Sequence, residues 1–257
     1  MSLSSRSAAV EVARRALRAL DLTCLDPDAD RARLLALCRA ARTPFGAPSA
    51  LCVYPEWIAT CRDALDALGL DTVRTASVAN FPGGWRDPVR AEAEVRRAIA
   101  AGADEIDLVF PHAAFQVGDR AGAGALVRAC KRACAGRTLK VILETSALGS
   151  PHAIRAAADL ALAFGADFLK TSTGVGGAHA TIEAAGALLD VLVGHGEAGL
   201  KISGGLARLD DVAPYIALVD ARMGPHWGGP ERFRIGASRL LDEIVAVLAS
   251  ADTAPPA

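Results

Sequence analysis

The stretch DPVRAEAEVRRAIAAGADEIDLVFP (87–111) contains the pattern from which the fold can be predicted. It begins with aspartate followed by proline, which is typical of a helix start, and Gly102 lies where that helix should end. The residues that follow, 105–111, include the run DLVF (107–110), which is apolar at consecutive positions after its aspartate, as expected of a parallel strand that is buried on both faces. The stretch therefore predicts one helix followed by one buried strand.

The same alternation recurs along the chain. Alanine-rich helices are expected at 123–136 and 150–166, and SSRSAAVEVARRALRAL (4–20) predicts an amphipathic helix that leads into the fold. The expected strands are 20–25, 50–55, 72–78, 105–111, 139–145, 167–173, 199–205 and 232–238.

Eight such units in 257 residues, one per about 32 residues, predict a TIM (β/α)8 barrel with an extra N-terminal helix. A doubly wound open sheet is the main alternative, but no G-x-G-x-x-G turn follows the first expected strand. No linker divides the chain, so we expect a single domain over 1–257, with a short disordered C-terminal tail from about 250 to 257.

Composition excludes several classes of protein. A hydrophobic fraction of 52% and a charged fraction of 22% exclude a disordered chain. The net charge of −1 provides no bulk attraction to nucleic acid or to an anionic membrane, and no apolar run reaches the ~18 residues of a membrane span. The six cysteines lack C-x-x-C and zinc spacings, which favours buried, reduced thiols in a cytoplasmic protein. The histidines are scattered, so we expect no metal and no cofactor.

Lysine is scarce, and this makes each lysine informative. The chain has four lysines against 24 arginines, so a lysine marks a place where arginine cannot substitute, such as amine chemistry. Lys170 and Lys201 end adjacent expected strands, where each charge would lower the pKa of the other amine. The alternative is a solvated or ion-paired lysine. Lys131, in a helix, and Lys140, at the N-terminal end of its strand on the stability face, are expected to be unreactive.

Acidic residues within expected strands are further candidates. Asp107 lies in the middle of the strand 105–111, where an unpaired carboxylate would be costly to bury. It could transfer a proton, orient a lysine or form a buried ion pair. Asp21 is a similar acid in the first strand, whereas Asp104 and Glu105 are expected to be solvated at the strand entrance.

Glycines follow the last two expected strands. Gly204 and Gly205 come after the seventh, and IGAS (235–238) ends the eighth. In TIM barrels these loops commonly hold a phosphate, because glycine lets backbone N–H groups approach the anion. A tight turn is the alternative explanation.

Five segments, in this order, resemble the deoxyribose-phosphate aldolase family: GADEIDLVFPH (102–112), KVILETSAL (140–148), GADFLKTSTG (165–174), LKISGG (200–205) and FRIGASRLL (233–241). LDLTCL (20–25) and ALCVYPEWI (50–58) fit as well, and the resemblance extends from about residue 17 to 248.

The resemblance implies a cytoplasmic class I aldolase that needs no cofactor and acts in deoxyribose phosphate catabolism. It would interconvert 2-deoxy-D-ribose 5-phosphate with D-glyceraldehyde 3-phosphate and acetaldehyde, and would bind only such small substrates. It implies that Lys170 forms the Schiff base, that Lys201 perturbs its pKa and that Asp107 relays protons. A homo-oligomer, dimeric or tetrameric, is also possible on this basis. The substrate-binding residues that it implies are Asp21, Thr23, Cys52, Thr173, Gly204, Gly205, Gly236 and Ser238.

The chain departs from the family pattern in two places. Some members have two serines where this chain has Ser238 followed by Arg239, and some end in a tyrosine where this chain ends in TAPPA (253–257). Two other functions stay open. One is a phosphosugar isomerase or decarboxylase that uses lysine and aspartate only electrostatically, and the other is an inactive barrel that serves as a binding subunit.

Overall fold

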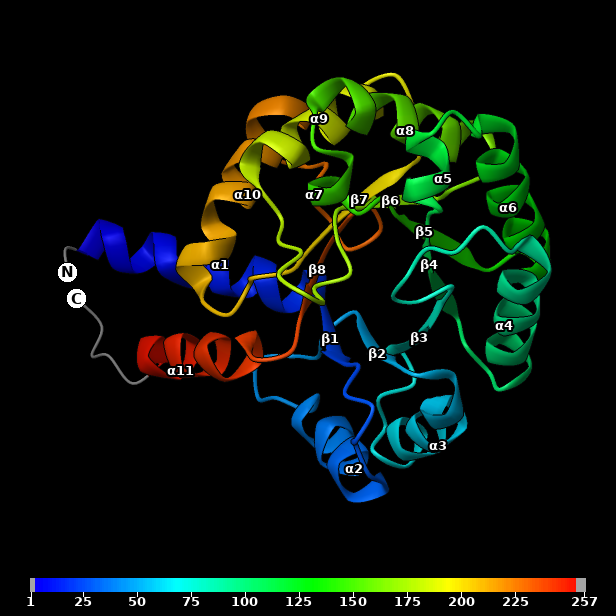
Figure 1. The fold of residues 1–257 in the computed structure, drawn as a ribbon. Coiled ribbons are helices and arrows are strands. Elements are labelled where there is room, and N and C mark those ends of the chain that lie inside the picture. Colours follow the sequence, from blue (N-terminus) through cyan, green and yellow to red (C-terminus); the bar gives the residue numbers. More distant parts are fainter. Residues whose placement is uncertain (1–2, 253–257) are drawn as a thin grey trace.

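The computed structural model describes residues 3–252, and its eight parallel strands close into a barrel in the order β1 to β8 (Figure 1). β1 pairs with both β2 and β8, so the first and last strands close the cylinder. The predicted TIM barrel is confirmed. The strands are β1 (Leu20–Cys24), β2 (Ala50–Val53), β3 (Arg74–Ala79), β4 (Glu105–Val109), β5 (Thr138–Ile142), β6 (Phe168–Lys170), β7 (Gly199–Ser203) and β8 (Phe233–Ala237).

Helices surround the barrel and pack on its outward-facing side chains (Figure 1). The helical segments are α1 (Leu3–Ala19), α2 (Arg31–Ala40), the short 3-10 helix η1 (Pro55–Trp57), α3 (Ile58–Ala67), α4 (Pro88–Ala100), α5 (His112–Gln116), α6 (Arg120–Ala133), α7 (Thr145–Leu148), α8 (Pro151–Ala163), α9 (Ile182–Leu192), α10 (Leu209–Met223) and α11 (Leu240–Asp252).

The helix boundaries follow the local signals in the sequence. Asp87 and Ser150 cap α4 and α8, and each side chain accepts a hydrogen bond from the backbone N–H three residues further on. Gly102, Gly136 and Gly165 follow helices and have φ of 100°, 87° and 102°, the left-handed region that glycine adopts without steric cost.

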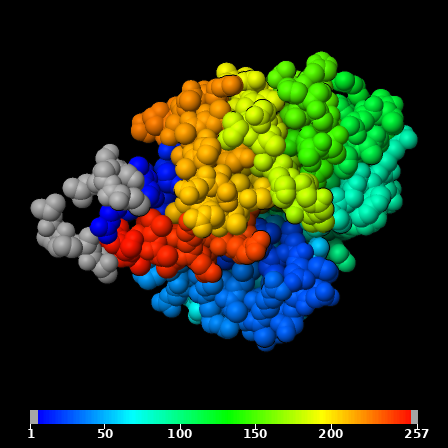
Figure 2. Space-filling model, turned by 60° about the vertical axis from the view of Figure 1, so that its left-hand side comes forward, coloured from blue at the N-terminus to red at the C-terminus, as the bar shows by residue number. Residues whose placement is uncertain are grey.

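The extra N-terminal helix packs against the end of the chain. α1 lies alongside α11 and also contacts α10, so the two ends of the described chain meet on one side of the barrel (Figures 1 and 2). α11 continues through Asp252, so the first residues of the predicted tail are helical, and the rest of that tail, 253–257, lies outside the described residues.

Two expectations about the chain as a whole can be compared with the structure. All six cysteines are buried and none forms a disulfide, as predicted for reduced thiols. Between residues 3 and 252, no helix has both the length and the apolar character that crossing a membrane requires.

β6 is shorter than its predicted range of 167–173, since it ends at Lys170. Thr171 and Ser172 stay buried beyond the strand end, because the Thr171 N–H donates to the carbonyl of Lys201 and the Ser172 carbonyl accepts from the Ser203 hydroxyl. The regular strand therefore ends at Lys170, but the chain leaves the barrel only after Ser172, where the loop that borders the candidate site begins.

Candidate active site

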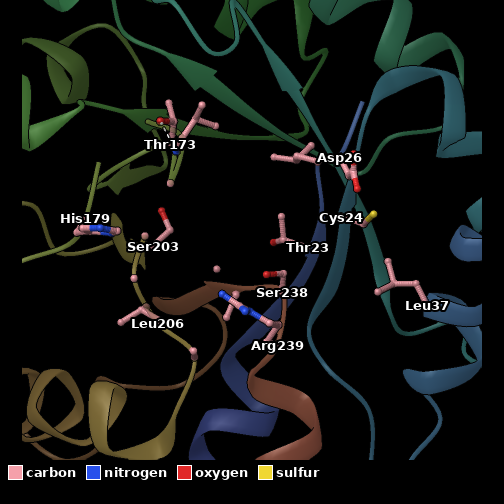
Figure 3. Close-up of a pocket in the computed structure, with 18 of the residues that line it drawn as sticks. Thr23, Cys24, Asp26, Leu37, Thr173, His179, Ser203, Leu206, Ser238 and Arg239 are labelled. Carbon is pink, nitrogen blue, oxygen red and sulfur yellow. Dashed lines mark hydrogen bonds between the residues drawn. The ribbon is translucent and has the colours of Figure 1, made fainter. Parts of the chain in front are cut away.

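A cavity of about 670 Å³ opens at the C-terminal ends of the strands, where TIM-barrel active sites lie. Figure 3 shows Thr23 and Ser238 on one side of it, facing Ser203 and His179 on the other. Residues from β1, β6, β7, β8, the loops that follow these strands, helix α2 and the loop after β3 line the cavity. They include Thr23, Cys24, Arg33, Phe81, Lys170, Thr173, His179, Ser203, Gly204, Gly205, Gly236, Ser238 and Arg239.

The two lysines singled out from the sequence lie side by side at the floor of this cavity. Lys170 on β6 and Lys201 on β7 are partners in register on neighbouring strands. Both ammonium groups donate to the same oxygen, Oδ2 of Asp107, each at 2.7 Å. Lys170 lines the cavity, whereas Lys201 and Asp107 are fully buried beneath it. The structure therefore brings these three side chains together.

The surroundings of Lys170 and Lys201 shift the pKa values of the two amines in opposite directions. Burial lowers the pKa of Lys170, Asp107 opposes this shift, and the neighbouring charge of Lys201 adds to it, so the pKa lies below the ordinary value. Burial acts on Lys201 in the same direction, but Asp107 and Asp21 outweigh it and raise the pKa of that amine. Asp107 is itself held well below its usual pKa, because three lysines outweigh the effect of burial. Lys170 is the amine that most readily becomes neutral.

The structure corrects the expectation for Lys140 and Glu105. Lys140 does not lie on the stability face, and Glu105 is not solvated, since both side chains are fully buried inside the barrel. The Nζ of Lys140 lies 2.5 Å from Oε2 of Glu105 and 2.9 Å from Oδ1 of Asp107. The reason is the two-residue period of a strand, which turns Glu105 and Asp107 to the same interior face. Lys140, in register with Asp107, faces inward as well.

Arg234 is a buried cation that the sequence analysis missed. Its guanidinium donates to Asp21 Oδ1 at 2.8 Å and to Glu105 Oε1 at 2.8 Å. Only 2% of its side chain is exposed. The available signal was its position in FRIGA (233–237), two residues before Gly236, which places both residues on the same interior face.

The glycines that follow β7 and the one near the end of β8 pack closely against neighbouring protein atoms at the mouth of the barrel. Gly204 and Gly205 have φ of 92° and 76°, and a Cβ on Gly204 would come within 2.3 Å of the carbonyl oxygen of Ala178. A Cβ on Gly236 would lie 3.0 Å from Cβ of Ser203 and 3.1 Å from Cε of Lys201. A side chain on Gly204 or Gly236 would therefore collide with neighbouring protein atoms, so the packing at this end of the barrel requires glycine at both positions.

A second missed residue, Glu144, supports the loop over Lys170. It lies two residues after the end of β5 and has φ of 54°, an uncommon value for a residue with a side chain. Its Oε2 accepts hydrogen bonds from the hydroxyl of Thr173 at 2.6 Å and from the Thr173 N–H at 3.2 Å. Backbone strain at the C-terminal end of a barrel strand was not detectable from sequence composition, although such strain often marks a functional position.

Comparison with known proteins assigns the family. Residues 15–221 match the family model described as DeoC/LacD family aldolase, which covers well over half of the chain. The chain belongs to this family. The predicted resemblance is confirmed at that level, and the protein is an aldolase, that is, a lyase that acts on a carbon–carbon bond.

Solved structures agree with this assignment. A protein from Coccidioides immitis, provisionally described as a deoxyribose-phosphate aldolase, is 28% identical with a TM-score of 0.78, covering 90% of this chain and 86% of its own. One from Toxoplasma gondii with the same provisional description is 25% identical, with a TM-score of 0.88 and coverage of 96% and 99%. The deoxyribose phosphate aldolase of Aeropyrum pernix, described as tetrameric, is 24% identical with a TM-score of 0.75 and coverage of 98% and 99%, and it supports the fold.

In this aldolase some of the expected substrate-binding residues line the cavity, and others are buried beneath it. Thr23, Thr173 and Ser238 line the cavity, as do the three glycines 204, 205 and 236. Asp21 and Cys52 are fully buried and do not line it, and burial raises the pKa of the Cys52 thiol.

Charged groups at the rim of the cavity complete the site. Arg239 and His179 are exposed and line the cavity, although sequence reasoning had set His179 aside as a residue on a separate loop. Arg33 also lines it and is paired with Asp26. Over the part of the chain that the structure describes, no three His, Cys, Asp or Glu side chains are grouped so as to hold a metal ion.

Proposed function

We propose that this aldolase is a class I, Schiff-base enzyme that reversibly cleaves 2-deoxy-D-ribose 5-phosphate to D-glyceraldehyde 3-phosphate and acetaldehyde. The observation that carries the proposal is the position of Lys170. It reaches the cavity while sharing Oδ2 of Asp107 with a second lysine, Lys201. A desolvated amine beside another cation is the arrangement that activates lysine toward a carbonyl.

In the cleavage direction, the neutral amine of Lys170 adds to the C1 aldehyde of the open-chain sugar. Loss of water leaves a protonated imine. A base then removes the proton of the C3 hydroxyl, the C2–C3 bond breaks, and its electron pair moves into the imine to give an enamine. Glyceraldehyde 3-phosphate leaves, C2 is protonated, and hydrolysis releases acetaldehyde and restores the Lys170 amine. Synthesis is the same sequence in reverse.

The proton transfers are assigned to Asp107 and Lys201. Asp107 Oδ2 lies 2.7 Å from both amines, so a proton can pass between the carboxylate and either lysine without a large movement. Together with a bound water, this pair would reach the C3 hydroxyl and C2 of the substrate. Lys201 stays protonated through its contacts with Asp21 and Asp107 and keeps the proton of Lys170 labile.

The phosphate is assigned to the loops after β7 and β8. Gly204, Gly205 and Gly236 would present backbone N–H groups there, and Ser238 adds a hydroxyl at the start of α11. Arg239, in the position that is serine in some relatives, supplies a positive charge on the same rim. Binding energy from this remote group would hold the aldehyde end of the sugar against Lys170.

The remaining expected contacts concern the sugar chain. Thr23 and Thr173 line the cavity between the rim and Lys170 and are proposed to contact the sugar hydroxyls. Asp21 and Cys52 are the remaining proposed substrate-binding residues. They lie beneath the cavity, next to Lys201 and Lys170.

The test combines turnover with covalent trapping. Release of acetaldehyde from 2-deoxy-D-ribose 5-phosphate is followed with a coupled alcohol dehydrogenase, and a mixture of protein and acetaldehyde is reduced with borohydride and mapped by mass spectrometry. We expect turnover and a two-carbon adduct on Lys170. Lys170→Arg should lose both, because arginine cannot form the imine, whereas the matched control Lys131→Arg should keep both. Turnover without an adduct would overturn the Schiff-base mechanism. An adduct without turnover would overturn the assignment of 2-deoxy-D-ribose 5-phosphate as the substrate.

We also propose a cytoplasmic, single-domain protein that assembles as a homo-oligomer. The six unpaired thiols support the location, and the barrel closed by β1 and β8 supports a single domain. The tetrameric description of the Aeropyrum pernix enzyme supports the assembly. Light scattering of the purified protein tests the oligomeric state, and a monomeric mass would contradict it.

A further inference from the structure

Six buried charged side chains form a closed ring inside the barrel, in which positive and negative groups alternate. Asp107 contacts Lys201 at 2.7 Å, Lys201 contacts Asp21 at 2.5 Å, and Asp21 contacts Arg234 at 2.8 Å. Arg234 contacts Glu105 at 2.8 Å, Glu105 contacts Lys140 at 2.5 Å, and Lys140 returns to Asp107 at 2.9 Å. We call this set the charge ring: Asp107, Lys201, Asp21, Arg234, Glu105 and Lys140.

The charge ring is balanced without Lys170. It contains three carboxylates and three cations, and every member has ring contacts on both sides. Lys170 is attached from outside through one carboxylate contact, to Asp107 Oδ2, which Lys201 already occupies. When Lys170 is protonated, the buried cluster therefore carries one positive charge too many.

We propose that Glu105 and Arg234 are positioning residues that complete this neutral ring and thereby make Lys170, rather than Lys201 or Lys140, the amine that gives up its proton. Neither residue lines the cavity, so neither contacts the substrate there. They act through the net charge that Lys170 encounters, since an uncompensated charge in a buried site is costly. The inference rests on the proposed role of Lys170 as the reacting amine.

The directions of the pKa shifts agree with the contact pattern. Burial lowers the pKa of all three lysines, but the carboxylate contacts of Lys140 and Lys201 outweigh it and raise their values. The single carboxylate contact of Lys170 does not outweigh burial, so the pKa of Lys170 is lowered. All three are fully buried or nearly so, so the number of carboxylate partners distinguishes them.

Two other ionisable groups lie beside the charge ring, and neither changes the charge balance of the buried site. Arg74 is 3.6 Å from Glu105, but its side chain is 43% exposed and also pairs with Glu231 at the protein surface. Solvent therefore screens it. The Cys52 thiol lies near Lys170, Lys201 and Asp107, and burial raises its pKa, which keeps it neutral.

The test measures the proton affinity of Lys170 directly, without any aldolase substrate. The folded protein is labelled with traces of acetic anhydride over a range of pH, and the acetylation of each lysine is quantified by mass spectrometry. Only the neutral amine reacts, so the midpoint for Lys170 reports its pKa in the native protein. Lys131, on α6, is the internal reference in the same sample.

The two single variants should shift this midpoint in opposite directions. Glu105→Gln removes a negative charge and should move the Lys170 midpoint to lower pH, whereas Arg234→Gln removes a positive charge and should move it to higher pH. A unit charge across roughly 10 Å of protein at an effective dielectric of about 20 shifts a pKa by about one unit. We expect shifts of about that size for Lys170 and none for Lys131.

Two further variants separate charge from folding. Arg234→Lys keeps the charge and should leave the midpoint near that of the wild type, and the double variant E105Q/R234Q is balanced again and should also return close to it. Circular dichroism checks that each variant is folded, and the double variant provides the test if a single variant is not. Shifts in the same direction for both single variants, or a double variant that stays displaced, would overturn the inference.

The outcome is distinguishable from failure of the proposed function. If Lys170 shows these shifts but the protein does not cleave 2-deoxy-D-ribose 5-phosphate, the charge ring stands and the substrate assignment fails. If cleavage occurs but the Lys170 midpoint does not respond to Glu105→Gln and Arg234→Gln, the reaction stands and the role of the ring fails.

Discussion

Lys170 and Lys201 donate to the same carboxylate oxygen of Asp107, each at 2.7 Å, from paired positions on adjacent strands. The two amines have nearly the same burial but different partners, since Lys201 has Asp21 as well. One shared oxygen cannot fully compensate two buried ammonium groups. The geometry thus makes Lys201 the cation of the resting site and Lys170 the amine that loses its proton more readily.

The first prediction concerns pH. Because the pKa of Lys170 is lowered, the fraction of neutral amine rises as pH increases through a midpoint below the ~10.4 of free lysine. The initial rate of borohydride-trapped adduct formation with acetaldehyde should therefore rise with pH and reach half of its maximum below the ordinary pKa of lysine. A midpoint at the ordinary lysine pKa would show that the site does not perturb Lys170.

The second prediction concerns Gly236. Its Cβ would sit 3.0 Å from Ser203 and 3.1 Å from the Lys201 side chain, so Gly236→Ala should displace one of them. We expect a loss of roughly tenfold in kcat/KM, which corresponds to about 1.4 kcal/mol of transition-state stabilisation. Gly229→Ala is the control, since a Cβ there meets nothing within 4 Å and should leave the rate unchanged. Equal rates for both variants would argue against a crowded site at Gly236.

The third prediction concerns Glu144. Replacing it with glutamine removes the charge that holds the hydroxyl and N–H of Thr173 and should loosen the loop over Lys170. Hydrogen bonds to a charged group contribute about 1.5–3 kcal/mol, so we expect KM to rise roughly tenfold or more. Thr173→Val should reproduce most of that effect, and the double variant should add little to it. Additive effects would mean that Glu144 does not act through Thr173.

The fourth prediction concerns acid stability. Asp21, Glu105 and Asp107 are held below their usual pKa by the buried cations, despite burial. Their contribution to stability is present above the unfolded-state values of about 3.9–4.3 and is lost as pH falls through and below them. The urea midpoint should drop steeply between pH 5 and pH 3. Asp63→Asn, at an exposed position of α3, should leave that slope unchanged.

Much of the fold was predictable because its signals are local. Apolar runs separated by alanine-rich helices predicted eight units, and Asp87-Pro88 and Ser150-Pro151 marked two helix starts that the structure confirms. The strand ends were less predictable. Residues 171–173 are Thr-Ser-Thr, and threonine is common in strands, but the regular strand ends at Lys170 although Thr171 still bonds to the backbone of Lys201 and Thr145.

The position of Lys170 and Lys201 on adjacent strands followed from the sequence alone, because consecutive β/α units place their strands side by side. The expectation that both lysines end their strands was wrong for Lys201, which lies in the middle of β7. The composition added that lysine is rare here, so both stood out against 24 arginines. The hydrogen-bond partners of these lysines could not be predicted from the sequence. Which oxygen each amine reaches depends on strand register and side-chain direction across the closed barrel, and neither is encoded in a local pattern.

Only the tertiary structure decided the environment of Lys140, Glu105 and Arg234. In the sequence they are ordinary charged residues near strand starts, typical of a solvated barrel end. In the closed barrel they are buried against one another and against Asp21 and Asp107. The physical reason is that burial of a charge depends on every strand at once. A carboxylate from β1 meets a guanidinium from β8 only when the two ends of the chain come together to close the barrel.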